Sequence, residues 1–456
     1  MVHHGGGPPA CGHHARPHGT IRRAGSCPWP YHVTHPFPLM PMRSPRTPFV
    51  SMSSIRLVLT ATAMLTGALL AACGSDPVSV GALGVGSGTT LTHVAIGNVS
   101  DRYTSELWVR GNTAYTSSWG IRSVARGNAV KIWDVSTDQP RLVDSVIVEN
   151  ASTTGDVQVS DDGSIMLVAI ESNPNGGVAI YSMADARKPQ LLVRTTGGEM
   201  QYGVHTAELA RVNGVLYAFC VVDPSSNVAS RLVVLDLSNP ATPRTVFSQA
   251  MGRPNLHDVF VRDGLLFTAE WNDGMGIWDI GGAGNGSVAQ PRRISRITTL
   301  GGQVHNMWWI HDPVTGNKQY VLVGQEGPGS IGSTSSGDIH VVDISNIQLP
   351  VEVAFYTMPG AGTHNFSVDE ANGFAYAAYY NGGVQVLDVR GDLGNCAPGQ
   401  RGADGRCDLQ KMGRWKARYA GGLSAPVYVW GVHWTPTGVF ASDMLHGLFR
   451  ASPAKR

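Results

Sequence analysis

The clearest pattern in the chain is a short apolar segment that ends in an acidic residue and returns at regular intervals. Each copy has the order apolar, any residue, apolar, apolar, Asp, apolar, and Ser replaces Asp in the second copy. The copies occupy residues 130–135, 178–183, 232–237, 275–280, 339–344 and 384–389. Apolar runs this short, bounded by Gly- and Pro-containing loops, are typical of buried β-strands rather than helices. The pattern therefore predicts an all-β fold built from a repeated unit.

Each copy is flanked by further strand-like segments, so the whole repeat contains four strands. Two apolar strands joined by a Gly-containing turn precede the motif, and a partly apolar strand follows it, usually after a proline. Four-stranded antiparallel units of about 40 to 55 residues, repeated along a chain, are typical of a β-propeller. The first strands open near seven positions, which predicts seven blades: Thr104, Asp156, His205, His257, His305, His364 and His433.

The seventh unit lacks a fourth strand, because Arg456 follows soon after its third strand. The segment Leu91–Gly97 precedes the first unit and has the pattern of a strand without partners. We expect this segment to complete the last blade, so that the ring closes between the two ends of one propeller domain spanning residues 90–456. The alternative is an open array of units that begins with an irregular N-terminal arm.

The first 51 residues have a composition unlike the rest of the chain. They hold 10 of the 27 prolines and 7 of the 16 histidines, without an apolar periodicity that could bury a face. We expect this stretch to be disordered and to reflect a mis-assigned gene start, with Met52 as the natural initiator.

Residues 52–72 have the pattern of a signal peptide. Arg56 precedes an apolar run from Leu57 to Leu70, and small residues follow before Cys73. The ending Leu-Ala-Ala-Cys resembles a bacterial lipobox, which implies a lipid on Cys73, a flexible tether over 73–89 and a location in the cell envelope. An outer-membrane or cell-surface position is favoured over the inner membrane, because no inner-membrane retention signal follows the cysteine. An ordinary signal peptide with a chance cysteine is the alternative.

The positive charge of the leader offsets the negative charge of the expected mature protein. The whole chain carries a formal charge of +1, but its first 72 residues contain six arginines and no acidic residue. Residues 73–456 therefore carry a formal charge of −5. Without a basic stripe, this part of the chain is not expected to bind nucleic acid.

The repeated motif is similar to the one that names the LVIVD-repeat family of secreted bacterial propellers. The resemblance covers roughly residues 90–450 and rests on Val-Lys-Ile-Trp-Asp134, Leu-Val-Val-Leu-Asp236, Ile-His-Val-Val-Asp343 and Val-Gln-Val-Leu-Asp388. Ser182 and Arg450 depart from the pattern in the second and seventh units. The resemblance implies a fold and an export route, and it implies no agreed reaction.

A histidine opens the first strand in five consecutive units: His205, His257, His305, His364 and His433. Alignment on the following turn glycine places Thr104 and Asp156 at the equivalent positions of the first two units. First strands lie nearest the axis of a propeller, so these imidazoles and the Asp156 carboxylate are expected to line the channel mouth. Such a set could bind Zn or Cu. Two alternatives remain open, namely a structural role in hydrogen bonding and a role as general base.

Several other residues are candidates for ligand contact or for cross-linking. Strand direction places the loops between second and third strands on the histidine face, where exposed Trp119, Trp271, Tyr379 and Tyr380 would suit a sugar, peptide or protein ligand. These aromatic residues could equally cover blade edges. Cys396 and Cys407 flank a Gly-rich stretch in which a disulfide is plausible after export. Cys220 lies in an apolar strand and is expected to be a buried thiol.

No phosphate-binding loop, nucleophile elbow or His-Glu-x-x-His pair is present in the sequence. The leading hypothesis is therefore a lipid-anchored, extracytoplasmic propeller that acts as a binding scaffold for a protein, peptide or carbohydrate. The alternative is a metal-dependent, possibly copper-dependent, oxidoreductase that uses the histidines at the channel mouth. This second hypothesis rests on analogy with the copper-dependent thiol-oxidising propellers of the selenium-binding type.

Overall fold

The structure, a computed structural model, describes residues 91–172, 175–327, 336–422 and 426–455. All of them belong to one compact unit, Val78–Arg456. The expected leader, signal peptide and lipid site lie outside the described residues. Among the described residues, no helix is both long and apolar enough to cross a membrane.

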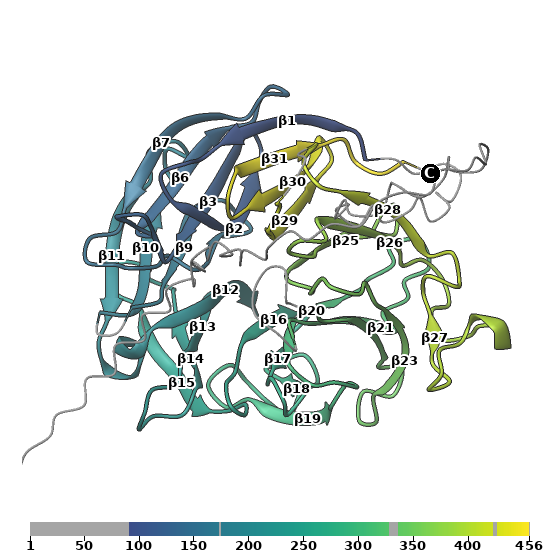
Figure 1. The fold of residues 1–456 in the computed structure, drawn as a ribbon. Coiled ribbons are helices and arrows are strands. Elements are labelled where there is room, and N and C mark those ends of the chain that lie inside the picture. The colour runs from purple at the N-terminus through teal and green to yellow at the C-terminus, as the bar shows by residue number, and fades with distance from the viewer. Residues whose placement is uncertain (1–90, 173–174, 328–335, 423–425, 456) are drawn as a thin grey trace, which may run out of the picture. The chain divides into compact units, whose positions relative to one another are not determined.

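The described chain forms seven four-stranded antiparallel blades in a ring, which confirms the predicted propeller (Figure 1). From the inner strand outward, the first blade contains β2 (Tyr103–Arg110), β3 (Thr113–Trp119), β6 (Ala129–Asp134) and β7 (Arg141–Ile147). The second blade contains β8 (Val157–Val159), β9 (Ile165–Ile170), β10 (Gly177–Ser182) and β11 (Gln190–Thr196). The third blade contains β12 (Val204–Val212), β13 (Val215–Val222), β14 (Arg231–Asp236) and β15 (Arg244–Ala250).

The next three blades repeat this arrangement. They are β16 (Asp258–Arg262), β17 (Leu265–Ala269), β18 (Met275–Asp279) and β19 (Arg292–Ile297); β20 (Val304–Trp309), β21 (Tyr320–Gln325), β22 (Ile339–Asp343) and β23 (Val351–Tyr356); and β24 (Phe366–Asp369), β25 (Phe374–Ala378), β26 (Val384–Asp388) and β28 (Trp415–Tyr419). The seventh blade contains β29 (Val429–Thr435), β30 (Gly438–Asp443) and β31 (Gly447–Ala451). Its outer strand is β1 (His93–Asn98), which pairs antiparallel with β31.

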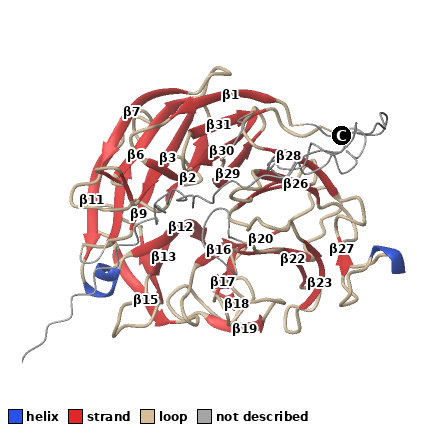
Figure 2. Cartoon of the chain, in the orientation of Figure 1, coloured by secondary structure: helices blue, strands red, loops and turns tan. Residues whose placement is uncertain are grey.

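Few elements fall outside the blades (Figure 2). The strands β4 (Ile121–Arg122) and β5 (Ala125–Arg126) form a small hairpin, and β27 (Cys407–Asp408) adds to the edge of β23 in parallel. The described helices are two short 3₁₀ turns, η1 (Gly198–Tyr202) and η2 (Pro398–Gln400). Cys396 and Cys407 are joined by a disulfide.

The core lies between neighbouring blades rather than within any single sheet. The third strands, which carry the repeated motif, are buried almost along their whole length, whereas the outer strands are largely exposed. In one typical cluster, Ile277 of the fourth blade packs with Met307 and Val321 of the fifth. Alternate side chains of each strand therefore pack against the preceding and following blades.

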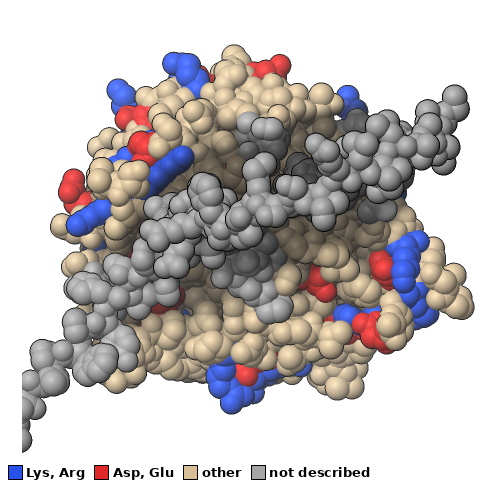
Figure 3. Space-filling view, viewed as in Figure 1, with Lys and Arg blue, Asp and Glu red and all other residues tan. Residues whose placement is uncertain are grey.

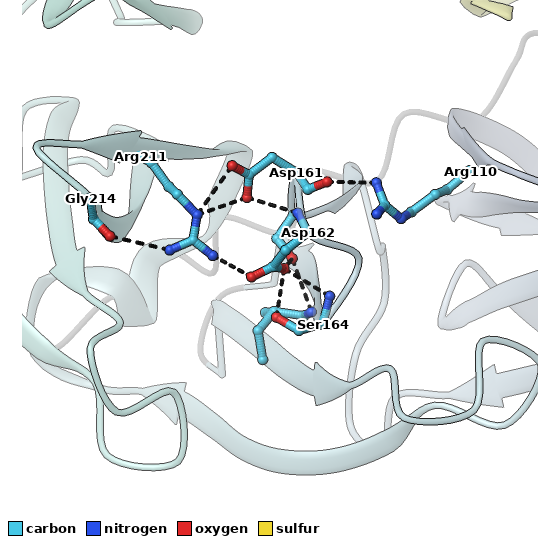
Figure 4. Close-up of polar contacts among 8 residues, drawn as sticks. Arg110, Asp161, Asp162, Ser164, Arg211 and Gly214 are labelled. Carbon is cyan, nitrogen blue, oxygen red and sulfur yellow. Dashed lines mark hydrogen bonds and ion pairs between the residues drawn. The ribbon is translucent and has the colours of Figure 1, made fainter.

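The side chains at the inner turns join consecutive blades through ion pairs (Figure 4). Arg211 of β12 donates to Asp161, with its Nε 2.9 and 3.1 Å from the two carboxylate oxygens, and also pairs with Asp162. Both acidic residues belong to the turn between β8 and β9, and the backbone carbonyl of Asp161 accepts from Arg110 of the first blade. Three blades are thus connected at the end of the inner strands opposite to the histidines.

Candidate functional site

Four imidazoles from consecutive blades meet at one end of the inner strands. His205 lies at the start of β12, His257 precedes β16, His305 lies at the start of β20 and His364 precedes β24. Successive ring centroids are separated by 4.4, 4.1 and 4.1 Å. Residues about fifty positions apart in the sequence are therefore in direct contact, because the inner strand of each blade begins at the same end of the axis.

His433, the fifth predicted member, lies elsewhere. It is within β29, and its ring centroid is 4.8 Å from that of Trp108. The position next to His364 is occupied instead by Trp430, at a centroid distance of 4.5 Å. The β12–β13 and β20–β21 ladders are irregular at His205 and His305, and the β29–β30 ladder is irregular at Trp430. Trp430 is therefore the equivalent residue, and His433 lies three positions further along its strand.

The first two blades contribute no imidazole to this end. Asp156 lies beside the next inner strand, where its Oδ2 accepts from the backbone N–H of Ala207 at 3.0 Å, and it lines the central cavity. Thr104 is buried, and its backbone N–H donates to the Met444 carbonyl. The structure brings four of the five predicted histidines together and places Asp156 apart from them.

Three carboxylates that the sequence analysis did not single out lie against the imidazoles. Glu326 Oε2 is 3.8 Å from His257 Nε2, and Glu326 Oε1 accepts from the Tyr380 hydroxyl at 2.6 Å. On the other side, His205 Nδ1 lies 3.2 Å from Glu171 and 3.9 Å from Asp223. His205 Nε2 is 3.1 Å from His257 Nε2, so His205 connects the two groups.

A simple signal in the sequence marks these carboxylates. The residue directly after the second strand is acidic in four consecutive blades, namely Glu171, Asp223, Glu270 and Glu326. The turn that follows each second strand lies at the histidine end, and three of these carboxylates, those of Glu171, Asp223 and Glu326, contact the imidazoles. The fourth, Glu270, pairs instead with Arg296 of the outer strand β19.

Two three-residue sets have ligand atoms close enough for one metal ion. The ligand atoms of His257, His305 and Glu326 lie within 4.8 Å of one another, and those of Glu171, His205 and Asp223 meet the same limit. His305 is 1% exposed, and neither of its ring nitrogens has a hydrogen-bond partner among the described residues. A buried polar atom without a partner costs about 1–3 kcal/mol, so this imidazole is the least explained by the protein alone.

Burial controls the protonation of the imidazoles. Desolvation lowers the pKa of His257, His305 and His364 well below the ordinary value, and the neighbouring imidazoles lower it further. Burial also disfavours the charged form of His205, but the carboxylates of Glu171, Asp223 and Glu326 outweigh it and raise its pKa to about 10. Three imidazoles are therefore neutral at pH 7, which is the form that binds metals.

Aromatic residues frame the cluster. Trp271 stacks on His257 with ring centroids 5.1 Å apart, and Tyr380 meets His364 edge-on at 5.0 Å. Both residues have positive φ, +46° and +38°, which is costly for bulky side chains and is found mainly where a site requires it. Trp119 lies 6.2 Å from the His205 ring.

The predicted exposed aromatic rim is wrong for its two tyrosines. Tyr379 and Tyr380 are fully buried, and their hydroxyls donate to the Gly337 carbonyl and to Glu326. Trp119 and Trp271 are only partly exposed. These loop residues turn inward because the loops between second and third strands pair with the next blade, as Tyr380 does with Val429.

A second layer of acidic groups lies beneath the imidazoles, around a cavity of about 390 Å³ on the axis. Burial, reinforced by Asp156 and Asp258, raises the pKa of Glu106 to about 8. Burial likewise raises the pKa of Asp156 to about 6 and that of Asp258 to about 7. Cys220, in contrast, is a buried strand thiol as predicted, and burial raises its pKa to about 12.

Comparison with protein families identifies a match in the third blade. The family model of the LVIVD repeat matches residues 227–250, which contain all of β14 and β15. No curated protein matches the chain. The match and the seven-bladed ring agree with the predicted LVIVD-type propeller, a fold consistent with a scaffold.

Proposed function

We propose that this protein binds a transition-metal ion at the axial end of the propeller. The ligands would be His257, His305 and Glu326, with His205 adjacent to them. The observation that carries the proposal is the His305 imidazole, which is buried with both nitrogens unpartnered among the described residues, within 4.8 Å of two other potential ligands.

The donor set indicates which metals fit. Imidazole nitrogens combined with one carboxylate oxygen suit Zn or Cu, whereas Mg and Ca prefer sites made of oxygen. Metal-ligating groups are normally oriented by a second hydrogen bond. Tyr380 gives such a bond to Glu326, and the Glu171 carboxylate faces the far nitrogen of His205.

A purely structural role accounts less well for the cluster. Structural histidines are expected to donate to or accept from backbone or side-chain groups. The His205–His257 contact is a hydrogen bond between imidazoles, but His305 has no such partner among the described residues. A bound ion would give these inward-facing lone pairs an electron acceptor.

The proposal places this site in an envelope protein. The lipobox-like ending at Cys73 supports a lipid-anchored, extracytoplasmic scaffold that presents the metal-bearing face. The broader possibility that this face also binds a protein, peptide or carbohydrate is supported only by partly exposed Trp119 and Trp271. A copper ion would supply one-electron redox chemistry, which is the basis of the oxidoreductase alternative.

The test is metal analysis of the full chain, purified without chelators and after incubation with Zn or Cu. We expect stoichiometric metal in the natural protein, and loss of most of it in the double variant His257→Gln with His305→Gln. The matched control is His433→Ala, which removes a histidine from an inner strand outside the cluster and should keep its metal.

Circular dichroism and the denaturation midpoint of each variant show whether the fold survives. A natural protein that takes up neither metal would overturn the proposal. Equal metal loss in a folded His433→Ala variant would also overturn it, because the site would then lie elsewhere.

A further inference from the structure

The cavity beneath the imidazoles has the size and lining of a small-molecule site. Its volume of about 390 Å³ lies within the range of roughly 300–1,000 Å³ typical of ligand pockets. Inner-strand residues of all seven blades line it. It is separate from the proposed metal ligands, which are absent from its lining.

The ionisable side chains of the lining are four carboxyl groups and the imidazole of His433. Four consecutive blades contribute one carboxyl each, from Glu106, Asp156, Glu208 and Asp258. Among the described residues that line the cavity, none is Lys or Arg. Burial raises the pKa of all four carboxyl groups, and no lysine or arginine of the described lining offsets it, so a bound cation would favour their charged forms.

Hydrogen bonding to the backbone of the next blade explains the presence of these carboxyl groups only in part. Asp156 accepts from the Ala207 N–H and Glu208 from the Val261 N–H, each at 3.0 Å, so both cap the inner strand of the next blade. At the equivalent junction between the sixth and seventh blades, the neutral Ser367 hydroxyl accepts from the Trp434 N–H at 2.9 Å. A neutral side chain therefore suffices for this role, and capping does not account for the presence of carboxyl groups at the other junctions.

Two further features of the lining favour an organic cation. The rings of Trp108, Phe260, Trp308 and Phe366 line the same cavity, and aromatic faces attract ammonium groups. Asn306 also lines it, is 3% exposed, and has a side-chain oxygen without a hydrogen-bond partner among the described residues. This oxygen is a buried acceptor that a ligand N–H group would satisfy.

We propose that the axial cavity binds an aliphatic amine that carries one or two ammonium groups. The carboxylates and the Asn306 oxygen accept its N–H groups, and the aromatic rings contact its methylene groups. A bare metal ion would leave the aromatic part of the lining unused. The site does not depend on the metal proposed above, because the two sets of residues do not overlap.

The test is calorimetric titration of the full chain with 1,4-diaminobutane, with 1,4-butanediol as the uncharged isostere and with Ca²⁺ as a metal probe. We expect the diamine to bind, and the diol to bind at least about tenfold more weakly, because a hydrogen bond to a charged group contributes about 1.5–3 kcal/mol. Equal affinities for diamine and diol, or binding of Ca²⁺ without binding of the diamine, would overturn the proposal.

Variants then locate the site. Glu208→Gln should weaken diamine binding about tenfold or more, whereas Glu149→Gln, which changes an exposed carboxylate outside the cavity lining, should leave it unchanged. If Glu208→Gln does not fold, Trp308→Leu keeps every carboxylate and should still weaken binding. Unchanged affinity in a folded Glu208→Gln variant contradicts the proposal. Diamine binding retained in the His257→Gln, His305→Gln variant would show that the two sites are independent.

Discussion

At the scale of single residues, the Asp that ends each third strand organises the turn that follows it. Asp134 and Asp236 each accept from the backbone N–H and the hydroxyl of a serine two positions later. Asp279 accepts from four backbone N–H groups at 2.7–3.0 Å. The motif Asp therefore caps its own turn and is not a partner of the axial histidines.

We predict that Asp279→Asn lowers the free energy of unfolding by about 2–3 kcal/mol, because an amide offers one acceptor to donors that lose their other partner. Burial acts to raise the pKa of Asp279, but the backbone donors lower it to about 2. The unfolded value is about 3.9, so the carboxylate stabilises the fold above pH 4 and loses this effect toward pH 2.

The deficit of the Asp279→Asn variant should accordingly be largest above pH 4 and narrow as the pH falls, in denaturant unfolding followed at several pH values. Asp343→Asn is the control, because Asp343 accepts one backbone N–H, from Ser345, and one side-chain amide, from Gln319. Equal deficits in the two variants at neutral pH would contradict the capping argument.

At the scale of elements, β1 belongs to the last blade but also contacts the first. It pairs with β31, while the Ile96 carbonyl accepts from Gln139 Nε2 at 2.7 Å. Gly97 lies under the Trp133 ring, where a Cβ atom would be 2.5 Å from the nearest ring carbon. The strand can therefore reach this position only because residue 97 has no side chain.

We predict that Gly97→Ala destabilises the protein by about 1–3 kcal/mol, since the added methyl group must displace a fully buried tryptophan. Gly399→Ala is the matched control, because no heavy atom lies within 4 Å of the added Cβ, and its effect should stay within about 0.5 kcal/mol. Unfolding in denaturant measures both changes, and a Gly97→Ala variant as stable as the control would refute the close packing.

At the scale of the whole molecule, charge is distributed unevenly. On the face seen in Figure 3, the visible Lys, Arg, Asp and Glu side chains lie mainly toward the outer edge of the ring. The carboxylates and imidazoles of the axis are instead buried or half-buried. Residues 73–456 are acidic overall, so electrostatic attraction to anionic lipid would not hold them at a membrane, and the proposed envelope location depends on the proposed lipid at Cys73.

We predict that Cys73→Ser moves the protein from the membrane fraction to the soluble fraction of its host cells and abolishes incorporation of labelled fatty acid. Cys220→Ala, which removes a buried thiol of the propeller, should leave both properties unchanged. Fatty-acid labelling that persists in Cys73→Ser would show that this cysteine is not the lipid site.

Much of the architecture follows from the sequence alone. The repeated motif predicts the strands, their number per blade and the seven units. Strand alternation and turn chemistry are local properties, and each repeat encodes them again in its own sequence. The capping role of residues such as Asp279 is local for the same reason, since its partners lie within seven positions.

Which side chains meet at the axis depends on the tertiary structure. Trp430 rather than His433 lies beside His364, because Trp430 occupies the irregular position of its inner strand that His205 and His305 occupy in theirs. Glu326 meets His257 although 69 positions separate them, and no local pattern encodes that distance. The repeated blade is encoded in the local sequence, whereas the side chains that share the proposed metal site and the acidic cavity depend on how seven copies of the blade close around one axis.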